Sequence, residues 1–342
     1  MASQCRRSLM GGRGDDFRHV PDVTGVTIRA RPNAAHSRLD RRSVEVISRM
    51  FQHLASRESI GRSFVAALAL LLVVMVVAGG LGISGPAIVT FSIWISLIGL
   101  VAVGAFLIAR AQRAFAGVGA IVAAIAVWMA YFWRANPGPF LWPVVFIIAA
   151  GLIVYGTRQD VSSPTAWLLL LPRFVVGWAF LDNGQNDYTW AFNGGNFLNS
   201  ANAAVQRGPL WFVEGPYNAF LGGVVVGRPD TWAGLFVSGE LIFGLLLALG
   251  LFTPIAAWGT MWLSANIIME KSFISHGAYV DKTYFVVELF CLISRSGLAY
   301  GLDVALLPYV PAAISSALVG ASPAEVPSRA KPSAQPVGLS AA

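Results

Sequence analysis

The sequence has little charge, little cysteine and little histidine. Only 12% of its 342 residues are charged and 56% are hydrophobic, whereas about a quarter of a typical soluble domain is charged. This shortage of charge excludes a soluble two-domain enzyme and a nucleic-acid-binding domain. The two cysteines, Cys5 and Cys291, lack Cys-x-x-Cys spacing, which excludes a disulfide scaffold. The composition predicts an all-α fold, a polytopic transmembrane helical bundle.

The four histidines are placed badly for cofactor chemistry. His19, His36 and His53 precede the first long apolar run, and His276 stands alone in a later loop. A b-type haem in a membrane needs paired histidines, and the His-Glu-x-x-His spacing of a zinc site is absent. No glycine-rich nucleotide motif follows a strand. The sequence therefore supports no haem, flavin, nicotinamide or metal.

Positive charge is concentrated before the first apolar run. Residues 1–62 contain 12 arginines and 6 acidic residues, nearly all of the net charge of +7. We expect the start of this cytoplasmic tail, residues 1–40, to be disordered because it lacks periodicity. Residues 40–62 have a helical pattern whose apolar face is formed by Val44, Ile47, Phe51 and Leu54. Such a basic amphipathic helix suits an anionic leaflet surface, although an ordinary solvated helix has the same pattern.

Long apolar runs fill the rest of the chain. A bilayer-spanning helix needs about 20 apolar residues, and the runs predict about eight spans at 64–81, 88–108, 115–133, 140–155, 166–181, 232–252, 255–269 and 283–293. A polar stretch, 182–231, separates the fifth span from the sixth. The prolines within 304–318 favour an interfacial segment over a ninth span, and a flexible tail follows.

The arginines predict the orientation. Arg110, Arg113, Arg158 and Arg295 all fall on the side of the Arg-rich tail, so we expect the N-terminus in the cytoplasm and a multi-pass protein of the plasma membrane. The stretch 182–231 is then an extracytoplasmic loop. We expect four units: the basic tail 1–62, a four-span unit at 63–160, a four-span module at 166–303 and a terminal segment at 304–342.

The ionisable residues of the spans lie in the second half of the chain. Charges inside a membrane are costly and mark functional sites. Helical spacing places them in one stripe on each of four helices. The stripes are Arg173, Gly177, Phe180 and Gly184; Glu240 and Gly244; Trp262, Asn266 and Glu270; and Asp281, Tyr284, Glu288, Cys291 and Arg295. We expect these stripes to converge in a polar centre, with Arg173 facing Glu240 or Glu288 as a neutralising pair.

Three segments resemble a known family. They are Arg173-Phe-Val-Val-Gly-Trp-Ala-Phe-Leu-Asp-Asn-Gly184, the glycine-rich run from Ser238 to Leu-Phe-Thr-Pro254, and Tyr279 to Glu288 followed by Gly301-Leu-Asp303. They are similar to helices of the DoxX/DoxD-like membrane family, over about residues 166–303. The resemblance implies a four-helix module. In DoxD-type members this module is the membrane subunit of thiosulfate:quinone oxidoreductase, and other members are associated with thiol redox partners.

The resemblance therefore predicts a quinone-linked oxidoreductase subunit that acts on a sulfur donor. A quinone site needs an apolar slot, aromatic ring contacts and groups that exchange protons. The candidate catalytic residues are Arg173, Glu240, Tyr284 and Glu288. The candidate ring contacts are Trp178, Trp262 and Asn266. Arg207 and Arg228 are the candidates for an anionic substrate. Expected partners are membrane lipids and a small redox or sulfurtransferase-like subunit, with no nucleic acid.

Two alternatives use the same residues differently. In a non-catalytic scaffold or partner-binding protein, the buried charges only fix the register of the helices. In a small-solute transporter, the polar stripes line a pathway.

Overall fold

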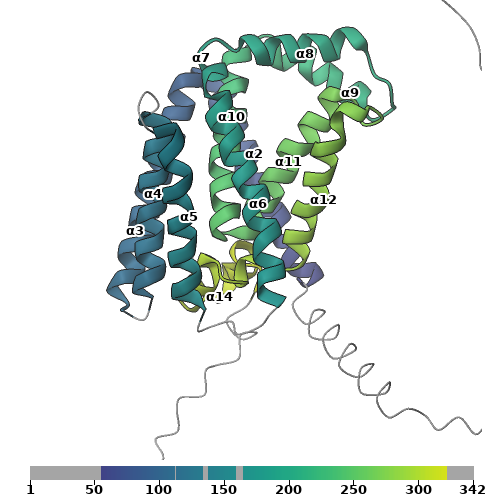
Figure 1. Cartoon of the computed structure of the whole chain (residues 1–342). Helices are drawn as coiled ribbons and strands as arrows, with labels where there is room; N and C mark the ends of the chain where they lie inside the picture. Colours follow the sequence, from purple (N-terminus) through teal and green to yellow (C-terminus); the bar gives the residue numbers. More distant parts are fainter. Residues whose placement is uncertain (1–54, 112, 134–137, 159–164, 322–342) are drawn as a thin grey trace, which may run out of the picture. The chain divides into compact units, whose positions relative to one another are not determined.

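The computed structural model describes residues 55–321, except 112, 134–137 and 159–164. Within these residues all regular structure is helical, which confirms the predicted fold class. The eight expected spans are the helices α2 (Arg57–Leu81), α3 (Gly85–Ala109), α4 (Ala114–Phe132), α5 (Gly138–Thr157), α6 (Thr165–Asn186), α10 (Pro229–Leu249), α11 (Thr253–Lys271) and α12 (Tyr279–Ile293) (Figure 1). The tail 1–40, most of the expected amphipathic helix, Cys5 and the tail beyond 321 lie outside the described residues.

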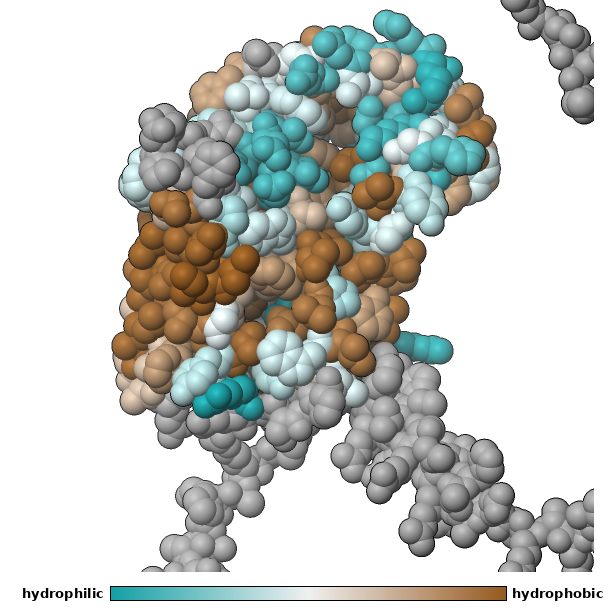
Figure 2. All heavy atoms as spheres, in the orientation of Figure 1, coloured by the Kyte–Doolittle hydropathy of each residue, from teal (hydrophilic) through white to brown (hydrophobic). Residues whose placement is uncertain are grey.

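Five helices of the described part of the chain are long and apolar enough to cross a membrane. They are α2, α3, α4, α10 and the continuous helical stretch Thr165–Phe192 that starts with α6. The apolar part of α5, Leu141–Thr157, is shorter, and α11 and α12 are more polar. Figure 2 shows hydrophobic residues over the sides of the long helices and hydrophilic residues gathered at one end. This distribution is that of an integral membrane bundle.

Glycine allows α6 and α10 to pack in direct contact. A Cβ added to Gly177 would lie 2.7 Å from the carbonyl oxygen of Gly244, and one added to Gly244 would lie 2.9 Å from the carbonyl oxygen of Gly177. Small residues permit such close crossing of membrane helices. The expected stripes on these two helices are confirmed as buried faces, and they face each other.

The helices that precede α6 pack against the later ones. A Cβ on Gly234 of α10 would clash with the backbone of Gly85 at the start of α3. Gln185 of α6 donates a hydrogen bond to the carbonyl oxygen of Ala130 in α4, at 3.2 Å. Buried residues of α3, α4, α5, α6 and α10 share one hydrophobic core. The expected four-span unit is thus continuous with the module that follows it.

The polar stretch 182–231 is largely helical, so its interpretation as a loop was wrong. Helix α6 continues past Asp182 to Asn186. The 3-10 helix η1 (Asp187–Thr189), α7 (Trp190–Asn193), α8 (Gly195–Arg207), α9 (Glu214–Phe220) and the π-helix η2 (Leu221–Val225) follow. Helix α8 lies across this end of the bundle, which we call the loop side (Figure 1). Its packing face carries Phe197, Ala201 and Ala204 at helical spacing.

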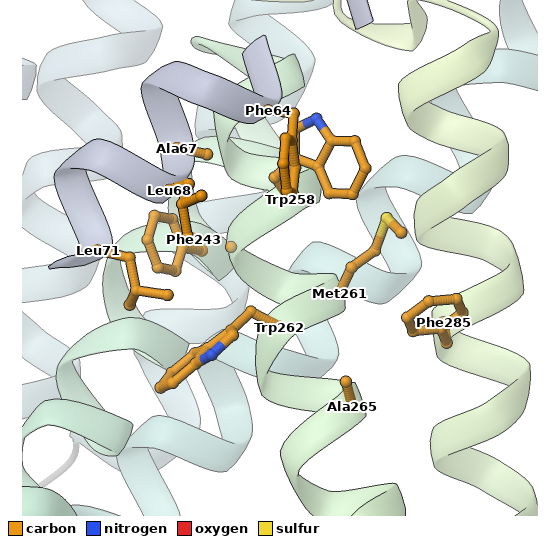
Figure 3. Close-up of a pocket in the computed structure, with 11 residues that line it drawn as sticks. Phe64, Ala67, Leu68, Leu71, Phe243, Trp258, Met261, Trp262, Ala265 and Phe285 are labelled. Atoms are coloured by element: carbon orange, nitrogen blue, oxygen red, sulfur yellow. The ribbon is translucent and has the colours of Figure 1, made fainter. Parts of the chain in front are cut away.

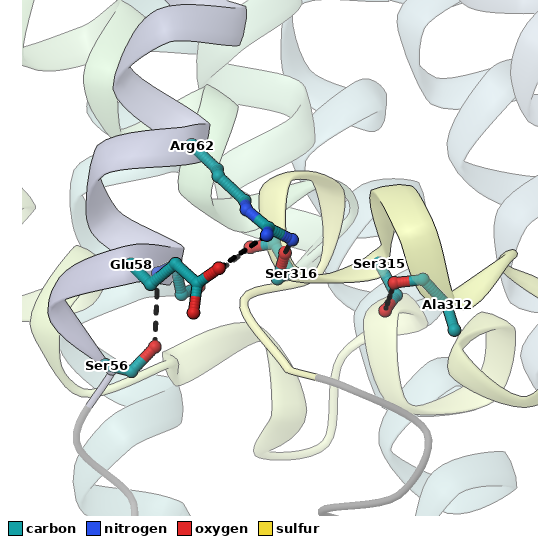
Figure 4. Close-up of polar contacts among 7 residues, drawn as sticks. Ser56, Glu58, Arg62, Ala312, Ser315 and Ser316 are labelled. Carbon is teal, nitrogen blue, oxygen red and sulfur yellow. Dashed lines mark hydrogen bonds and ion pairs between the residues drawn. The ribbon is translucent and has the colours of Figure 1, made fainter.

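The opposite end, which we call the tail side, is formed by short helices. These are η4 (Ser296–Leu298), α13 (Leu302–Leu306), η5 (Leu307–Tyr309) and α14 (Ala312–Leu318). With seven residues, α14 is too short to be a ninth span. It holds the start of α2: the Ser59 hydroxyl donates to the carbonyl oxygen of Ser316 at 2.7 Å, and Arg62 contacts both Glu58 and the Ser316 hydroxyl (Figure 4).

Candidate functional site

A polar chamber of about 310 Å³ lies beneath α8. Its walls come from α6 to α12, together with η1 and η2, so residues from across 183–281 meet there. The ionisable residues of the wall are Asp187, Glu240, Glu270, Lys271 and Asp281, and its aromatic residues include Trp190, Tyr217, Trp232 and Trp262. Lys271 and Asp281 form an ion pair at 2.8 Å. Within the described residues, no group of three His, Cys, Asp or Glu side chains is arranged to hold a metal ion.

Glu240 is the chamber residue that the fold places most deeply. Its side chain is 1% exposed. Its Cβ packs against Gly184 of α6, where an added Cβ would lie only 3.1 Å from it. Asp187 is the ionisable residue that acts on Glu240 electrostatically. The Glu240 Oε2 atom has no hydrogen-bond partner among the described residues. A buried polar atom without a partner is costly, so Glu240 has an oxygen free for a ligand.

The stripe on α11 faces the chamber as predicted. Trp262, Asn266 and Glu270 all line it. The Asn266 side chain donates to the carbonyl oxygen of Trp262 at 2.7 Å, and the Tyr217 hydroxyl donates to the carbonyl oxygen of Asn266 at 3.1 Å. Burial raises the pKa of Tyr217, and the nearby Glu270 adds to this effect. Tyr217 therefore stays a neutral hydrogen-bond donor in the chamber wall.

Arg173 does not pair with Glu240 or Glu288, so that expectation is wrong. Its guanidinium is buried on the tail side, where it donates to the carbonyl oxygens of Ser296 and Ala299. Its electrostatic neighbours are Cys291 and Asp303. Two acidic residues thus remain without the expected cation. The reason is that the turn after α12 supplies the partners of Arg173, the carbonyl oxygens of Ser296 and Ala299, on the tail side of α6.

Asp303 joins the three sequence segments that carry the family resemblance. Its carboxylate accepts hydrogen bonds from the backbone N–H groups of Phe252 and Thr253, at 2.6 and 3.0 Å, at the start of α11. Burial raises the pKa of Asp303 to about 7, while these bonds and Arg173 favour its charged form. The cluster of Arg173, Asp303, Ser296 and the Gly250 turn is enclosed, so we interpret it as a structural lock.

The polar seam of α12 is divided between two environments. Asp281 lies in the chamber wall. Glu288 is fully buried between α11 and α12, where it accepts a hydrogen bond from the Ser264 hydroxyl at 3.0 Å. Cys291 is a buried free thiol between Glu288 and Arg173. The Tyr284 ring packs against Phe180 at 6.1 Å. Neither Glu288 nor Tyr284 lines the chamber.

The remaining predicted site residues are also dispersed. Trp178 stacks on Trp142 of α5 at 4.9 Å, away from the chamber. Arg207 donates to the carbonyl oxygen of Glu270 at 2.7 Å, and Arg228 donates to that of Gly79 in α2. His276 is exposed at the start of the 3-10 helix η3 (His276–Ala278). The two arginines are bound to different helices and do not form one anion site. Of the predicted residues, the chamber gathers Glu240, Trp262 and Asn266.

Two apolar cavities adjoin the chamber. A groove of about 920 Å³ is bounded by α2, α3 and α10. A smaller pocket of about 230 Å³ lies between α2, α10, α11 and α12 (Figure 3). Leu71, Phe243 and Trp262 line both apolar cavities, and Trp262 also lines the chamber. Trp262 therefore forms part of the wall of one polar space and of two apolar spaces.

These features define a multi-pass integral membrane protein with a polar chamber beneath a helical cover. Residues 168–276 match the family model described as DoxX. This segment includes most of α6, all of α10 and α11 and the helical stretch between α6 and α10 that covers the chamber, in agreement with the resemblance predicted from the sequence. The match starts within α6 and ends before α12, a shorter range than the expected 166–303. Neither a curated protein nor a solved structure matches the chain significantly.

Proposed function

We propose that the protein is the membrane subunit of a quinone-linked oxidoreductase, with the quinone ring in the polar chamber. The observation that carries the proposal is the position of Trp262, which lines both the chamber that contains Glu240 and two apolar cavities. An amphipathic ring with an apolar tail needs such a junction. Bound there, the quinone would accept two electrons and two protons.

Three residues fit the ring. The Trp262 indole offers an aromatic face, and the Asn266 amide lies one turn further along the same wall of the chamber. Glu240 has an oxygen without a partner, which a protonated carboxyl would use to donate to a ring oxygen. Glu240 therefore holds and exchanges the proton, and Asp187, its neighbour towards the loop side, passes protons between Glu240 and water.

The sulfur donor belongs, in this proposal, to a partner. Arg207 and Arg228 are separated, which leaves no built site for an anion such as thiosulfate in the described residues. A small redox or sulfurtransferase-like subunit on the loop side would supply the electrons. With the Arg-rich tail in the cytoplasm of a plasma-membrane protein, the loop side faces outward. In a C5S chain, Phe212→Cys should react with an impermeant maleimide on intact cells; protection there and labelling only after lysis would reverse the orientation.

Quinone reduction tests the function. The purified full chain, with any co-purifying subunit, is supplied with a short-tail quinone and thiosulfate or a thiol. We expect saturable quinone reduction, lowered about 100-fold in Glu240→Gln, the range of lost proton transfer. Melting temperature should not change. Reduction that is equal in the wild type and in E240Q would contradict the assigned role of Glu240.

A scaffold is the second candidate, because the hydrogen bonds of Arg173 and Glu288 join parts of the helical bundle to one another and lie outside the chamber. A scaffold predicts no saturable quinone binding in any variant. It also predicts that Glu240→Gln changes stability or partner binding alone. Pull-down with the loop-side partner and quinone titration on the same sample separate the two functions.

A further inference from the structure

Tyr131 of α4 lies close to Glu240, although α4 precedes the DoxX match. The Tyr131 side chain is 3% exposed. A Cβ added to Gly184 of α6 would lie 3.1 Å from the Tyr131 hydroxyl oxygen and 3.1 Å from the Cβ of Glu240. Both residues therefore border the same small space, which a side chain at position 184 would fill. Tyr131 does not line the chamber, so it can act on a ligand there only through Glu240.

Contacts with other segments fix the position of Tyr131. The carbonyl oxygen of the preceding residue, Ala130, accepts a hydrogen bond from the Gln185 side chain of α6 at 3.2 Å. The Tyr131 ring packs edge-on against the ring of Tyr188, with the ring centroids 5.7 Å apart. Tyr188 follows Asp187 directly in η1. At Tyr131, helix α4 therefore meets the segment that carries Asp187.

The proposed reaction requires a hydrogen-bond donor at Glu240. When Glu240 gives its proton to the ring oxygen, a buried carboxylate remains. Arg173, the cation expected there, is bound on the tail side, and the electrostatic neighbour of Glu240 is another acidic residue, Asp187. A hydrogen bond to a carboxylate is roughly twice as strong as one to a neutral group. A hydroxyl group beside Glu240 therefore stabilises the transition state of the transfer more than the state before it.

We propose that Tyr131 is a positioning residue whose hydroxyl group donates a hydrogen bond to the Glu240 carboxyl. This inference rests on the proposed function, in which Glu240 gives its proton to a quinone reduced by the sulfur donor. The bond orients the carboxyl and stabilises the carboxylate until Asp187 returns a proton. The helices that precede the DoxX match then have a role in the chemistry, because α4 supplies this hydroxyl group.

Three variants separate the hydroxyl group from the ring and from the fold. Tyr131→Phe removes the oxygen and keeps the ring. Tyr155→Phe is the matched control, because Tyr155 is 45% exposed near the end of α5 and its ring packs against Phe115, away from the chamber. Gly184→Ala places a methyl group between the Tyr131 hydroxyl and Glu240.

The first measurement does not depend on activity. It is the infrared C=O stretch of the protonated Glu240 carboxyl, recorded on the full chain in lipid nanodiscs without quinone and identified as the band that Glu240→Gln removes. A carbonyl group that loses a hydrogen bond absorbs at higher wavenumber. We therefore expect the band to move to higher wavenumber in Y131F and in G184A, and to stay in place in Y155F.

The second measurement is the reduction of a short-tail quinone by the full chain, with any co-purifying subunit and with thiosulfate or a thiol as donor. We expect Y131F to lower kcat about tenfold and to leave KM nearly unchanged, because the lost bond is strongest in the transition state. Y155F should reduce quinone as the wild type does. The melting temperature of Y131F should equal that of the wild type.

Each other outcome identifies what failed. If Glu240→Gln removes no C=O band, Glu240 holds no proton, and the proposed function fails together with this inference. A Glu240 band that does not move in Y131F overturns the role of Tyr131 alone, as does a kcat of Y131F equal to that of the wild type. A band that moves in Y131F, while the wild type reduces no quinone, confirms the hydrogen bond and overturns its role in proton transfer together with the proposed function.

Discussion

Gly177 and Gly244 pack backbone against backbone where α6 crosses α10. Each lacks the Cβ that would lie under 3 Å from the carbonyl oxygen of the other. This contact sets the separation of the two helices, and it lies one turn from Glu240. The position of the Glu240 carboxyl thus depends on the absence of a side chain at both Gly177 and Gly244.

Substitution of Gly244 by alanine should destabilise the bundle. Overpacking of this kind typically costs about 1–3 kcal/mol, because neither backbone can retreat without moving Glu240. Thermal unfolding in detergent measures the loss. Gly151→Ala on α5, where nothing lies within 4 Å, should change stability by no more than about 0.5 kcal/mol. Equal melting of G244A and wild type would contradict the close crossing.

Arg173→Met should damage the fold and leave the chamber intact. The substitution leaves the Asp303 carboxylate and two carbonyl oxygens without their cation, at a cost of about 3–5 kcal/mol. A lower melting temperature with unchanged quinone binding per folded molecule is expected. If R173M instead melts normally and loses quinone, Arg173 belongs to the site and its assignment as a lock is wrong.

Glu214 should make the loop side sensitive to acid. Its carboxylate accepts hydrogen bonds from the Ser272 hydroxyl and from the backbone N–H groups of Phe273 and Leu210. Burial opposes the charge, yet these bonds and Arg207 lower the pKa of Glu214 below its usual value. Because the folded state then binds fewer protons than the unfolded state, the stabilisation is complete above the unfolded pKa, about 4.3. It is lost as the pH falls through the folded value.

Comparison of wild type with Glu214→Gln checks this linkage. At pH 7 the variant should be less stable by about 1–3 kcal/mol, the cost of weakening bonds to a buried charge. The difference should shrink below about pH 4. Glu58→Gln is the control, because Glu58 is exposed and pairs only with Arg62, a contact of about 0.5 kcal/mol at most. A difference independent of pH would exclude Glu214 as its source.

The sequence predicted the helices well and their meeting point poorly. Long apolar runs predict spans because the hydrocarbon core of the bilayer disfavours polar side chains. The periodicity of the polar residues predicted which faces of α6, α10 and α11 are buried. Periodicity gives a face but no depth and no neighbour. Arg173 and Glu240 both point inward from adjacent helices, yet they lie at different levels, and Arg173 finds its partners in a turn more than 120 residues later.

The cover over the chamber was missed for a different reason. Asparagine and glycine suggested a loop, although Phe197, Ala201 and Ala204 of α8 have the spacing of a buried helix face. Asp187 and Tyr217 could not be found from sequence, because the cover brings them to the chamber from outside the spans. The role of Glu214 could not be predicted either, because its hydrogen-bond donors Ser272 and Phe273 are far away in sequence and close only in the folded chain.

The most direct test is the titration of short-tail quinone into the full chain in nanodiscs, comparing wild type with Glu240→Leu, which cannot donate a hydrogen bond to the ring. Saturable binding by the wild type and about tenfold weaker binding by E240L are expected, with no loss of melting temperature in the absence of quinone. Binding that does not saturate, or that is the same in both proteins, would contradict the chamber as a quinone site.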